Sequence, residues 1–318
     1  MSASSILTVT LNPALDVTTS VERMKPMQKL RCRAPRYDPG GGGVNVSRAI
    51  KELGGTSHAF VALAGCAGQR YRQILEGTGI ESEIWPMSGE TRFSLTVMEH
   101  ASGLQYRFLL PGPEQDAEEA DRLLSALTGS IGKGYRFVVA SGSLPPGLPA
   151  DFYGRLASRT RELGAALILD TSGPALRAAM AQRPFLIRLN HYEAQELVGG
   201  SSDAEAATYE LVGELLERNA AETVIVTVGE QGAIVATGGQ LLRIHPPKVR
   251  VVSAVGAGDS FVAALTLGLA QDWPLEKASR YAVAAAAAVV TTEATQLCDR
   301  ATTEKLFEET AGQAERLD

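Results

Sequence analysis

The sequence has few cysteines, and their arrangement excludes two common ways of stabilising a fold. Cys32, Cys66 and Cys298 are an odd number in a chain of 318 residues, and no two of them form a C-x-x-C pair. We therefore expect neither structural disulfides nor zinc, but reduced thiols of the kind found in the cytoplasm. The four histidines lack the spacing of a metal site and give no further metal-binding motif.

Long hydrophobic runs and an excess of positive charge are also lacking. The longest apolar stretch, residues 281–290, is about half as long as a bilayer crossing requires, and no secretory signal is visible at the N-terminus. Thirty Lys and Arg against 36 Asp and Glu give a net charge of −6, so nucleic-acid binding has no global electrostatic basis. We expect a cytoplasmic protein that binds neither membranes nor nucleic acids.

The sequence does contain a change of rhythm between its two parts. In the first part, short runs such as residues 93–98 and 105–110 alternate apolar and polar residues, which is typical of half-exposed strands. From about residue 136 onward, continuous apolar strands alternate with helical stretches, which predicts parallel strands buried between helices. Because the connections are short, we predict one compact core with a strand-built insertion rather than two linked domains.

Four consecutive glycines, residues 40–43, precede an amphipathic segment that begins at Val44. Because glycines have no Cβ atoms, a ligand can approach their backbone closely and bind amide donors near a helix N-terminus. The run is not a dinucleotide fingerprint, because Val46 stands where the third glycine of G-x-G-x-x-G would fall, and the sequence also lacks a P-loop. From these residues alone, a flexible turn and a ligand-binding turn both remain open.

A second small-residue turn, Gly-Ala-Gly-Asp at residues 256–259, leads into an apolar helical segment. Its free backbone N–H groups would stabilise negative charge at the helix start. Asp259 in this turn has two interpretations. It is either an ordinary helix cap, or the base that a phosphoryl-transfer enzyme needs beside its anion-binding turn.

Several motifs, in order over essentially the whole chain, carry a resemblance to a known family. The chain resembles the phosphofructokinase B branch of the ribokinase family of sugar kinases. Residues 29–35, 39–45, 105–108 and 141–147 are similar to those of its type-2 6-phosphofructokinases. The motifs that carry the family resemblance are residues 11–16 (Leu-Asn-Pro-Ala-Leu-Asp), 40–45 (Gly-Gly-Gly-Gly-Val-Asn), 141–147 (Ser-Gly-Ser-Leu-Pro-Pro-Gly) and 256–259 (Gly-Ala-Gly-Asp).

The resemblance implies a fold and an activity. The fold would be a ribokinase-like three-layer α/β/α core with a mainly parallel sheet. It would form one domain over residues 1–318, with a small β lid from roughly residues 12–40 and 86–112, and would dimerise through the lid. The activity would be Mg²⁺-ATP-dependent phosphorylation of fructose 6-phosphate at its 1-hydroxyl. Alternatives are tagatose 6-phosphate or fructose 1-phosphate as acceptor, and a sugar-phosphate-binding regulator with little turnover.

The resemblance also places catalytic roles on matching residues. Asp259 would be the general base, and the amides of Ala257 and Gly258, in the turn that Gly256 opens, would form the anion hole. Asn190 and Glu193 match an N-x-x-E motif that organises Mg²⁺ largely through water. Mg²⁺ usually keeps several waters, so two oxygen side chains suffice. The structural alternative for Asn190 and Glu193 is a capped helix start.

On the acceptor side, the family pattern implies three kinds of contact. Side chains would bind the ring hydroxyls, glycines would allow close approach, and basic residues would bind the phosphate already on the sugar. Arginine suits phosphate because its planar fork donates two parallel hydrogen bonds. For any one basic residue, the alternative is a solvated charge that protects a strand edge. The residues are Asp16 and Asn45 for hydroxyls, Gly41 and Gly42 for close approach, Lys29, Arg31 and Arg92 for phosphate, and Ser143 as a further contact.

On the nucleotide side, the sequence departs from the family pattern. Arg188 stands where relatives usually carry lysine in Lys-Pro-Asn, and Ala254 replaces a threonine. An alanine run at residues 284–288, with Thr292 beyond it, replaces a more polar pattern that normally borders the adenine. We therefore expect an altered nucleotide affinity. The residues expected near ATP are Arg188, Asn190, Thr227, Gly229, Gly232, Ala254, Gly256, Gly258 and Ala287.

Overall fold

The structure, a computed structural model, describes residues 5–198, 205–292, 297–310 and 314–317. Its larger sheet has ten strands, which pair in parallel except at one edge. The strands are β1 (Ile6–Thr10), β4 (His58–Leu63), β5 (Glu81–Pro86), β8 (Phe137–Ser141), β9 (Ala166–Asp170), β10 (Leu186–Asn190), β11 (Thr223–Thr227), β12 (Ala233–Thr237), β13 (Gln240–Ile244) and β14 (Ala314–Arg316). Their order is β14-β13-β12-β11-β10-β9-β8-β1-β4-β5, and β12, β13 and β14 are the antiparallel edge.

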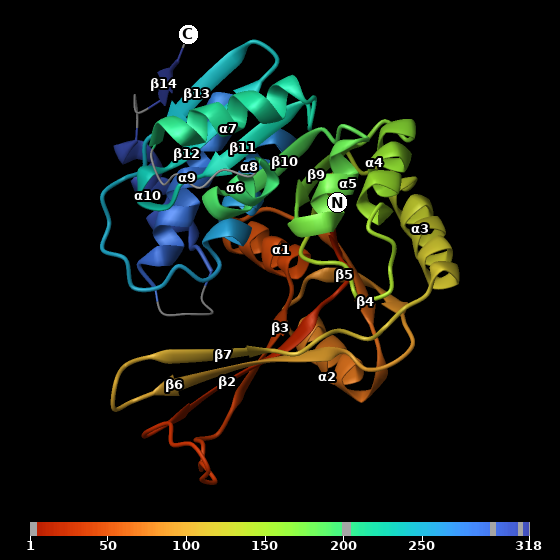
Figure 1. Ribbon diagram of the computed structural model, residues 1–318, viewed down its shortest axis with the longest axis vertical. Helices are drawn as coiled ribbons and strands as arrows, with labels where there is room; N and C mark the ends of the chain where they lie inside the picture. Colours follow the sequence, from red (N-terminus) through yellow and green to blue (C-terminus); the bar gives the residue numbers. More distant parts are fainter. Residues whose placement is uncertain (1–4, 199–204, 293–296, 311–313, 318) are drawn as a thin grey trace.

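Helices cover both faces of this sheet (Figure 1). One face packs against α3 (Ala117–Ile131), α4 (Phe152–Glu162), α5 (Gly173–Met180), α6 (His191–Val198) and α7 (Glu205–Glu217). The other packs against α1 (Gly42–Glu52), α8 (Ala257–Ala270), α9 (Leu275–Val290) and α10 (Arg300–Glu309). Successive strand residues alternate between the two cores: Val138 joins the first, and its neighbour Val139 the second. The three-layer α/β/α prediction is confirmed.

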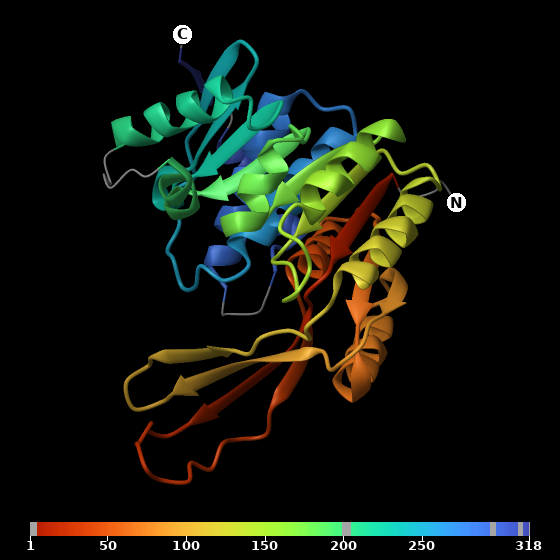
Figure 2. The same ribbon diagram turned by 45° about the vertical axis from the view of Figure 1, so that its right-hand side comes forward.

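A separate four-stranded sheet forms the lid and projects from the core (Figure 2). Its strands are β2 (Ala14–Val21), β3 (Arg36–Gly40), β6 (Arg92–Glu99) and β7 (Gln105–Leu109), in the order β3-β2-β6-β7. They lie within the predicted lid ranges. The root of the lid is held by a third hydrophobic cluster, in which Leu15 packs with residues of β4 and α2 (Gly65–Gly77).

The topology brings the polar ends of several strands to one edge of the larger sheet. Ser141 at the end of β8 pairs with Asp170 at the end of β9, and Asn190 at the end of β10 pairs with Thr227 at the end of β11. Because these strands are parallel, their carboxyl ends face the same side, where open α/β sheets bind ligands. None of the helices in the described residues has both the length and the hydrophobicity that a membrane crossing requires.

Candidate active site

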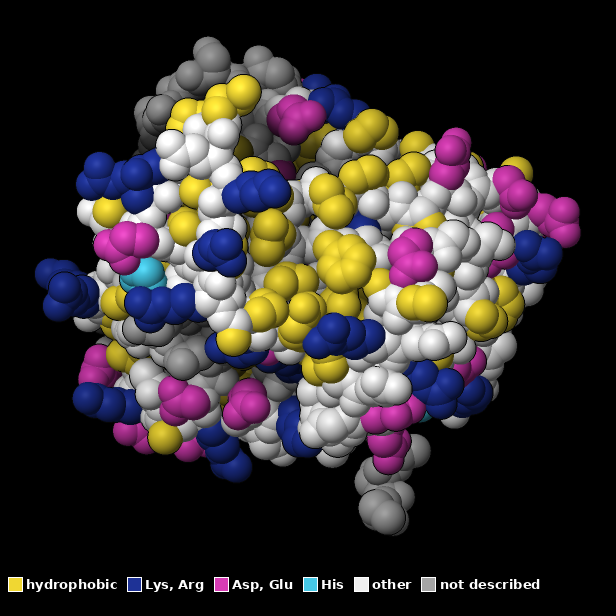
Figure 3. Space-filling view, turned by 90° about the horizontal axis from the view of Figure 1, so that it is seen from below, with side chains coloured by type: hydrophobic (Ala, Val, Ile, Leu, Met, Phe, Trp, Pro, Cys, Tyr) yellow, Lys and Arg dark blue, Asp and Glu magenta, His cyan; other side chains and the backbone are white. Residues whose placement is uncertain are grey.

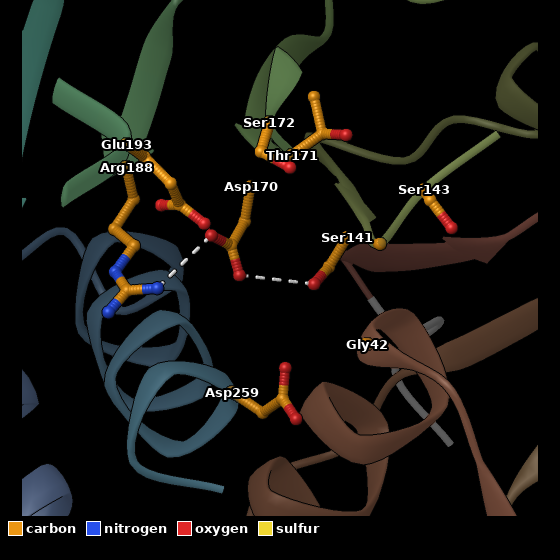
Figure 4. A pocket seen from close by; sticks show the side chains of 10 residues that line it. Gly42, Ser141, Ser143, Asp170, Thr171, Ser172, Arg188, Glu193 and Asp259 are labelled. Carbon is orange, nitrogen blue, oxygen red and sulfur yellow. Dashed lines mark hydrogen bonds and ion pairs between the residues drawn. The ribbon is translucent and has the colours of Figure 1, made fainter. Parts of the chain in front are cut away.

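A polar pocket lies at the carboxyl ends of the central strands, beside the first turns of α1 and α8 (Figure 4). It brings together five residues that the sequence had indicated, Gly42, Ser143, Arg188, Glu193 and Asp259. The pocket also contains residues that the sequence analysis did not name as candidates, and they lie on the loops after β8 and β9. These additional residues are Ser141, Gly142, Asp170, Thr171 and Ser172.

The first turn of α8 contains the residues expected to act as the general base and the anion hole. Gly256 adopts a left-handed conformation, with φ of 81°, and so reverses the chain into the helix at Ala257. A Cβ on Gly258 would lie only 2.7 Å from Nη1 of Arg188, so a larger residue would displace the arginine. The Asp259 carboxylate points from this turn into the pocket (Figure 4).

Asp259 is held from the opposite side by the helix that follows the glycine run. Nδ2 of Asn45 donates a hydrogen bond of 2.9 Å to Oδ2 of Asp259. The pKa of Asp259 is raised to about 7, mainly by burial and also by the nearby Asp170 carboxylate, although the Asn45 hydrogen bond opposes the shift. A carboxylate whose pKa lies near neutrality is suited to general-base catalysis.

Arg188 supplies positive charge to the pocket. Its Nη1 lies 3.3 Å from Oδ1 of Asp170, and its Nη2 donates a 2.7 Å hydrogen bond to Oγ1 of Thr227. Within the described residues, its buried Nε has no hydrogen-bond partner. Asp170 also accepts a hydrogen bond of 3.2 Å from Ser141. The guanidinium is therefore fixed across the pocket, against the turn that begins α8.

Asn190 and Glu193 cap the start of α6. The backbone N–H of Asn190 donates to Oε2 of Glu193 at 2.8 Å, and the N–H of Glu193 donates to Oδ1 of Asn190 at 2.9 Å. This reciprocal pair is a capping box, the structural alternative raised from the sequence. The Glu193 carboxylate nevertheless lines the pocket, and burial raises the pKa of Glu193. The carboxylate of Asp170 lines the pocket as well. Two carboxylates beside solvent fit Mg²⁺, which binds through one or two carboxylates and water.

Among the residues expected to bind the sugar, Asp16 lies on β2, against the backbone of Gly40. The backbone of Gly40 leaves so little room beside it that a Cβ there would lie 2.1 Å from Oδ2 of Asp16. Burial raises the pKa of Asp16 to about 6, although a hydrogen bond with Ser94 and the positive charges of Arg107 and Arg92 oppose that shift. Arg107 is a further basic residue on this side. The sequence had given a signal for it, since it lies in the motif at residues 105–108.

The three basic residues expected to bind phosphate differ in their surroundings. Arg92 donates hydrogen bonds of 3.2 and 3.1 Å to the carbonyl oxygen of Asn12, which ties the start of β6 to the loop after β1. Lys29 and Arg31, in contrast, lie in the loop between β2 and β3, outside the residues that line the pocket.

Ser143 accepts a hydrogen bond of 3.1 Å from Asn12.

Residues expected near the nucleotide lie beyond Arg188. Gly229 begins a short 3₁₀ turn (Gly229–Gln231), and Gly232 closes it with φ of 90° against the backbone of Ile244. Ala254 is exposed, whereas Ala287 is buried in the core. Thr227 contacts the pocket through Arg188.

Comparisons with known proteins agree with the geometry. Residues 10–302 match the family model described as "pfkB family carbohydrate kinase". The chain is 43% identical over 303 residues to the ATP-dependent 6-phosphofructokinase isozyme 2 of Mycobacterium tuberculosis, covering 95% of this chain and 89% of that protein. It is 36% identical over 307 residues to the isozyme 2 of Escherichia coli, with 95% and 97% covered. It is also 33% identical to the 1-phosphofructokinase of Bacillus subtilis, with 91% and 93% covered.

Solved structures of the Escherichia coli phosphofructokinase-2 superpose on this chain. The complex with fructose 6-phosphate has a TM-score of 0.88 and 35% identity, and the match covers 96% of this chain and 99% of that one. A tetrameric inhibited form of the same protein matches equally well, with a TM-score of 0.88. The predicted ribokinase-like fold is confirmed by these likenesses.

Proposed function

The chain belongs to the pfkB family of carbohydrate kinases, and from that premise we propose that it is a 6-phosphofructokinase. It transfers the γ-phosphate of ATP to the 1-hydroxyl of fructose 6-phosphate. The observation that carries the proposal is the position of Asp259. Its carboxylate lies in the first turn of α8 and accepts a hydrogen bond from Asn45 of α1. The similarity to two proteins named ATP-dependent 6-phosphofructokinase isozyme 2 supports the choice of acceptor.

In this proposal Asp259 takes the proton from the 1-hydroxyl as that oxygen attacks the phosphorus. The hydrogen bond from Asn45 fixes one carboxylate oxygen and leaves the other to accept the proton. The amides of Ala257 and Gly258, near the left-handed Gly256, stabilise charge on the transferring group. Arg188 adds positive charge beside the same turn, which suits a reaction catalysed mainly by positioning and electrostatics.

Mg²⁺ belongs to the proposal as the ion that accompanies ATP. Glu193 and Asp170 are the carboxylates that would hold it, with Asn190 fixing the orientation of Glu193 through the capping box. When bound, the ion neutralises charge on the phosphate oxygens. Thr227, Gly229 and Gly232 would then border the nucleotide, with Ala254 and Ala287 on the side of the base.

The sugar phosphate occupies the space between the lid and the glycine run. Asp16 binds ring hydroxyls, and the backbone of Gly41 and Gly42 allows the sugar to approach the start of α1. Ser143 contacts it from the loop after β8. We further propose that its phosphate is bound by basic residues of the lid, namely Lys29, Arg31, Arg92 and Arg107.

We propose that two chains pair through their lids, residues 12–40 and 86–112 of the single domain 1–318. The reason is apolar exposure on β7 and its flanks: Phe108 is 45% and Leu109 63% exposed. Neighbouring side chains of a strand point to opposite faces, so both faces here lack cover. Figure 3, which views the molecule from the lid end, shows hydrophobic side chains gathered together with Lys and Arg around them. Pairing would also carry Lys29 and Arg31 toward the cleft of the second copy.

A cytoplasmic location is part of the same proposal. Cys32 and Cys66 are free and exposed, a state that a reducing compartment maintains. No disulfide is found within the described residues, in which all three cysteines are free.

The experiment that tests the proposed function is a panel of acceptors in an assay coupled to ADP release with Mg²⁺-ATP. Fructose 6-phosphate is expected to give the highest kcat/KM, ahead of tagatose 6-phosphate and fructose 1-phosphate. The control is Asp259→Asn, which should fail with every acceptor. A higher kcat/KM for another sugar phosphate would reassign the acceptor, and the absence of turnover with all of them would favour a binding protein.

A further inference from the structure

Two buried tyrosines lie behind the acceptor side of the cleft, and the proposed reaction does not use them. Tyr71 on α2 and Tyr153 on α4 have no exposed surface. Each hydroxyl donates a hydrogen bond to the carbonyl oxygen of a glycine, from Tyr71 to Gly40 at 2.9 Å and from Tyr153 to Gly142 at 3.0 Å. Two helices from different parts of the chain thus make the same kind of contact.

One of these glycines lines the pocket, and the other lies directly against Asp16. Gly142 lines the pocket, and its φ of 106° is a conformation that few residues other than glycine adopt. Its N–H donates to the carbonyl oxygen of Asp170 at 2.9 Å, so the tyrosine and the strand hold it at both ends. Gly40 lies against the carboxylate of Asp16, at the start of the glycine run.

The two glycine segments also contact each other. A Cβ on Gly42 would lie 2.2 Å from Oγ of Ser141, and one on Gly142 would lie 3.7 Å from the nitrogen of Gly42. The segments therefore meet closely, with Gly42 against Ser141 and Gly142, and a shift of one changes the space that the other leaves for a sugar. We refer to residues 40–43 and 141–143 together as the glycine cradle.

We propose that Tyr71 and Tyr153 are positioning residues that fix the glycine cradle in its sugar-binding shape before the sugar arrives. Glycine-rich backbone gains the most freedom when it is not held, so an anchoring hydrogen bond has more effect here than elsewhere. A buried carbonyl that loses its donor is also costly, which opposes any move of the cradle away from the tyrosines. The inference rests on the proposed function, because it assigns the cradle to the acceptor.

The two hydroxyls are permanent donors under ordinary conditions. Burial raises the pKa of Tyr71 well above its ordinary value, and the Asp16 carboxylate raises it further. Burial likewise raises the pKa of Tyr153, with a contribution from Asp170. The anchors therefore do not titrate in the range where the enzyme works.

The test is Tyr71→Phe and Tyr153→Phe, which remove the hydroxyls and keep the rings. Each is expected to raise KM for the sugar phosphate about three- to tenfold and to leave KM for ATP within about twofold. The matched control is Tyr281→Phe, which removes the hydroxyl of another buried tyrosine that packs against Trp273 and Phe307. It should change neither KM. Equal changes in the two KM values, or none, would overturn the inference.

A second measurement covers variants that do not fold. Hydrogen exchange on the wild-type enzyme should show residues 40–43 and 141–143 almost as protected without sugar phosphate as with it. Protection that arises only on addition of the sugar phosphate would contradict a preformed cradle. The acceptor panel separates this inference from the proposed function, since the tyrosine comparison is run with whichever sugar phosphate the wild type accepts.

Discussion

The two halves of the cleft are built differently. On the side proposed for the acceptor, polar groups contact each other: Asn45 donates to Asp259, and Asn12 donates to Ser143. On the side expected to hold the adenine of ATP, most alanines of α9 face the core, and Val251 and Val252 are exposed. The backbone N–H of Val252 donates to Val290 at the end of α9, so an apolar edge forms there.

The difference indicates how each substrate is recognised. Under the proposed function, the acceptor would meet side chains that hydrogen bonds hold in place. Such side chains can distinguish hydroxyl positions, because an unpaired polar group in such a site is costly. The nucleotide would meet its main polar partners around the phosphates, at Arg188 and the first turn of α8. We infer that the enzyme selects its acceptor strictly and its nucleotide base loosely.

The largest effect is expected where the two halves meet. Asp259→Asn should lower kcat at least about 10²-fold, the usual range for removal of a general base. Asparagine keeps the shape of the side chain, so sugar-phosphate binding measured by equilibrium dialysis should persist. Near-wild-type turnover would show that another group takes the proton.

A smaller but one-sided effect is expected from Lys29→Ala in the lid. Loss of a charge-assisted hydrogen bond to phosphate should raise KM for the sugar phosphate about 10-fold or more and hardly change KM for ATP. Lys25→Ala, in the same exposed loop, is the matched control and should affect neither. If both variants raise the KM of both substrates alike, the loop acts through lid or dimer stability instead.

The nucleotide half is expected to tolerate a change of base. Ala254, Ala286 and Thr292 offer few hydrogen bonds to a nucleotide base. Each hydrogen bond between neutral groups that is missing weakens nucleotide binding by about 0.5–1.5 kcal/mol. We predict a high KM for ATP and activity with GTP within about tenfold of that with ATP. Initial rates with both nucleotides check this. A low-micromolar KM for ATP together with no use of GTP would establish a selective adenine site.

The sequence predicted most of the fold and the charged centre of the site, for identifiable reasons. Asp259 and the glycine run lie in local motifs, and the strands of the core are continuous apolar runs. Asp170 was missed although it is the last residue of the apolar strand β9. Its importance depends on Ser141 and Arg188, which belong to neighbouring strands and contact it only after folding. The anchoring of Gly40 by Tyr71 likewise joins two elements that no local pattern connects.

The smallest expected effect is on stability. The pKa of Asp259 is raised to about 7 by burial and by Asp170, above its value of 3.8 in the unfolded chain. A group whose pKa is raised in the folded state stabilises the fold at low pH, where the group is protonated. That contribution to stability is lost as pH rises through 7. Asp259→Asn should therefore melt about 1–3 °C above wild type at pH 8, with the gap narrowing toward pH 5.

Asp272 provides a control of opposite sign for that measurement. Arg136 lowers the pKa of Asp272 through an ion pair, so Asp272→Asn should not raise the melting temperature at pH 8. Thermal scans of the three proteins from pH 5 to 8 decide the matter. A constant gap between Asp259→Asn and wild type across this range would mean that Asp259 does not titrate within it.

The most direct test of the central claim is identification of the product. The enzyme is incubated with Mg²⁺-ATP and fructose 6-phosphate, and phosphorus NMR follows the phosphate esters that form. We expect a second phosphate monoester on carbon 1 of the sugar, in a one-to-one ratio with ADP, and none with Asp259→Asn. ADP formed without a new sugar phosphate ester, or an ester at another carbon, would contradict it.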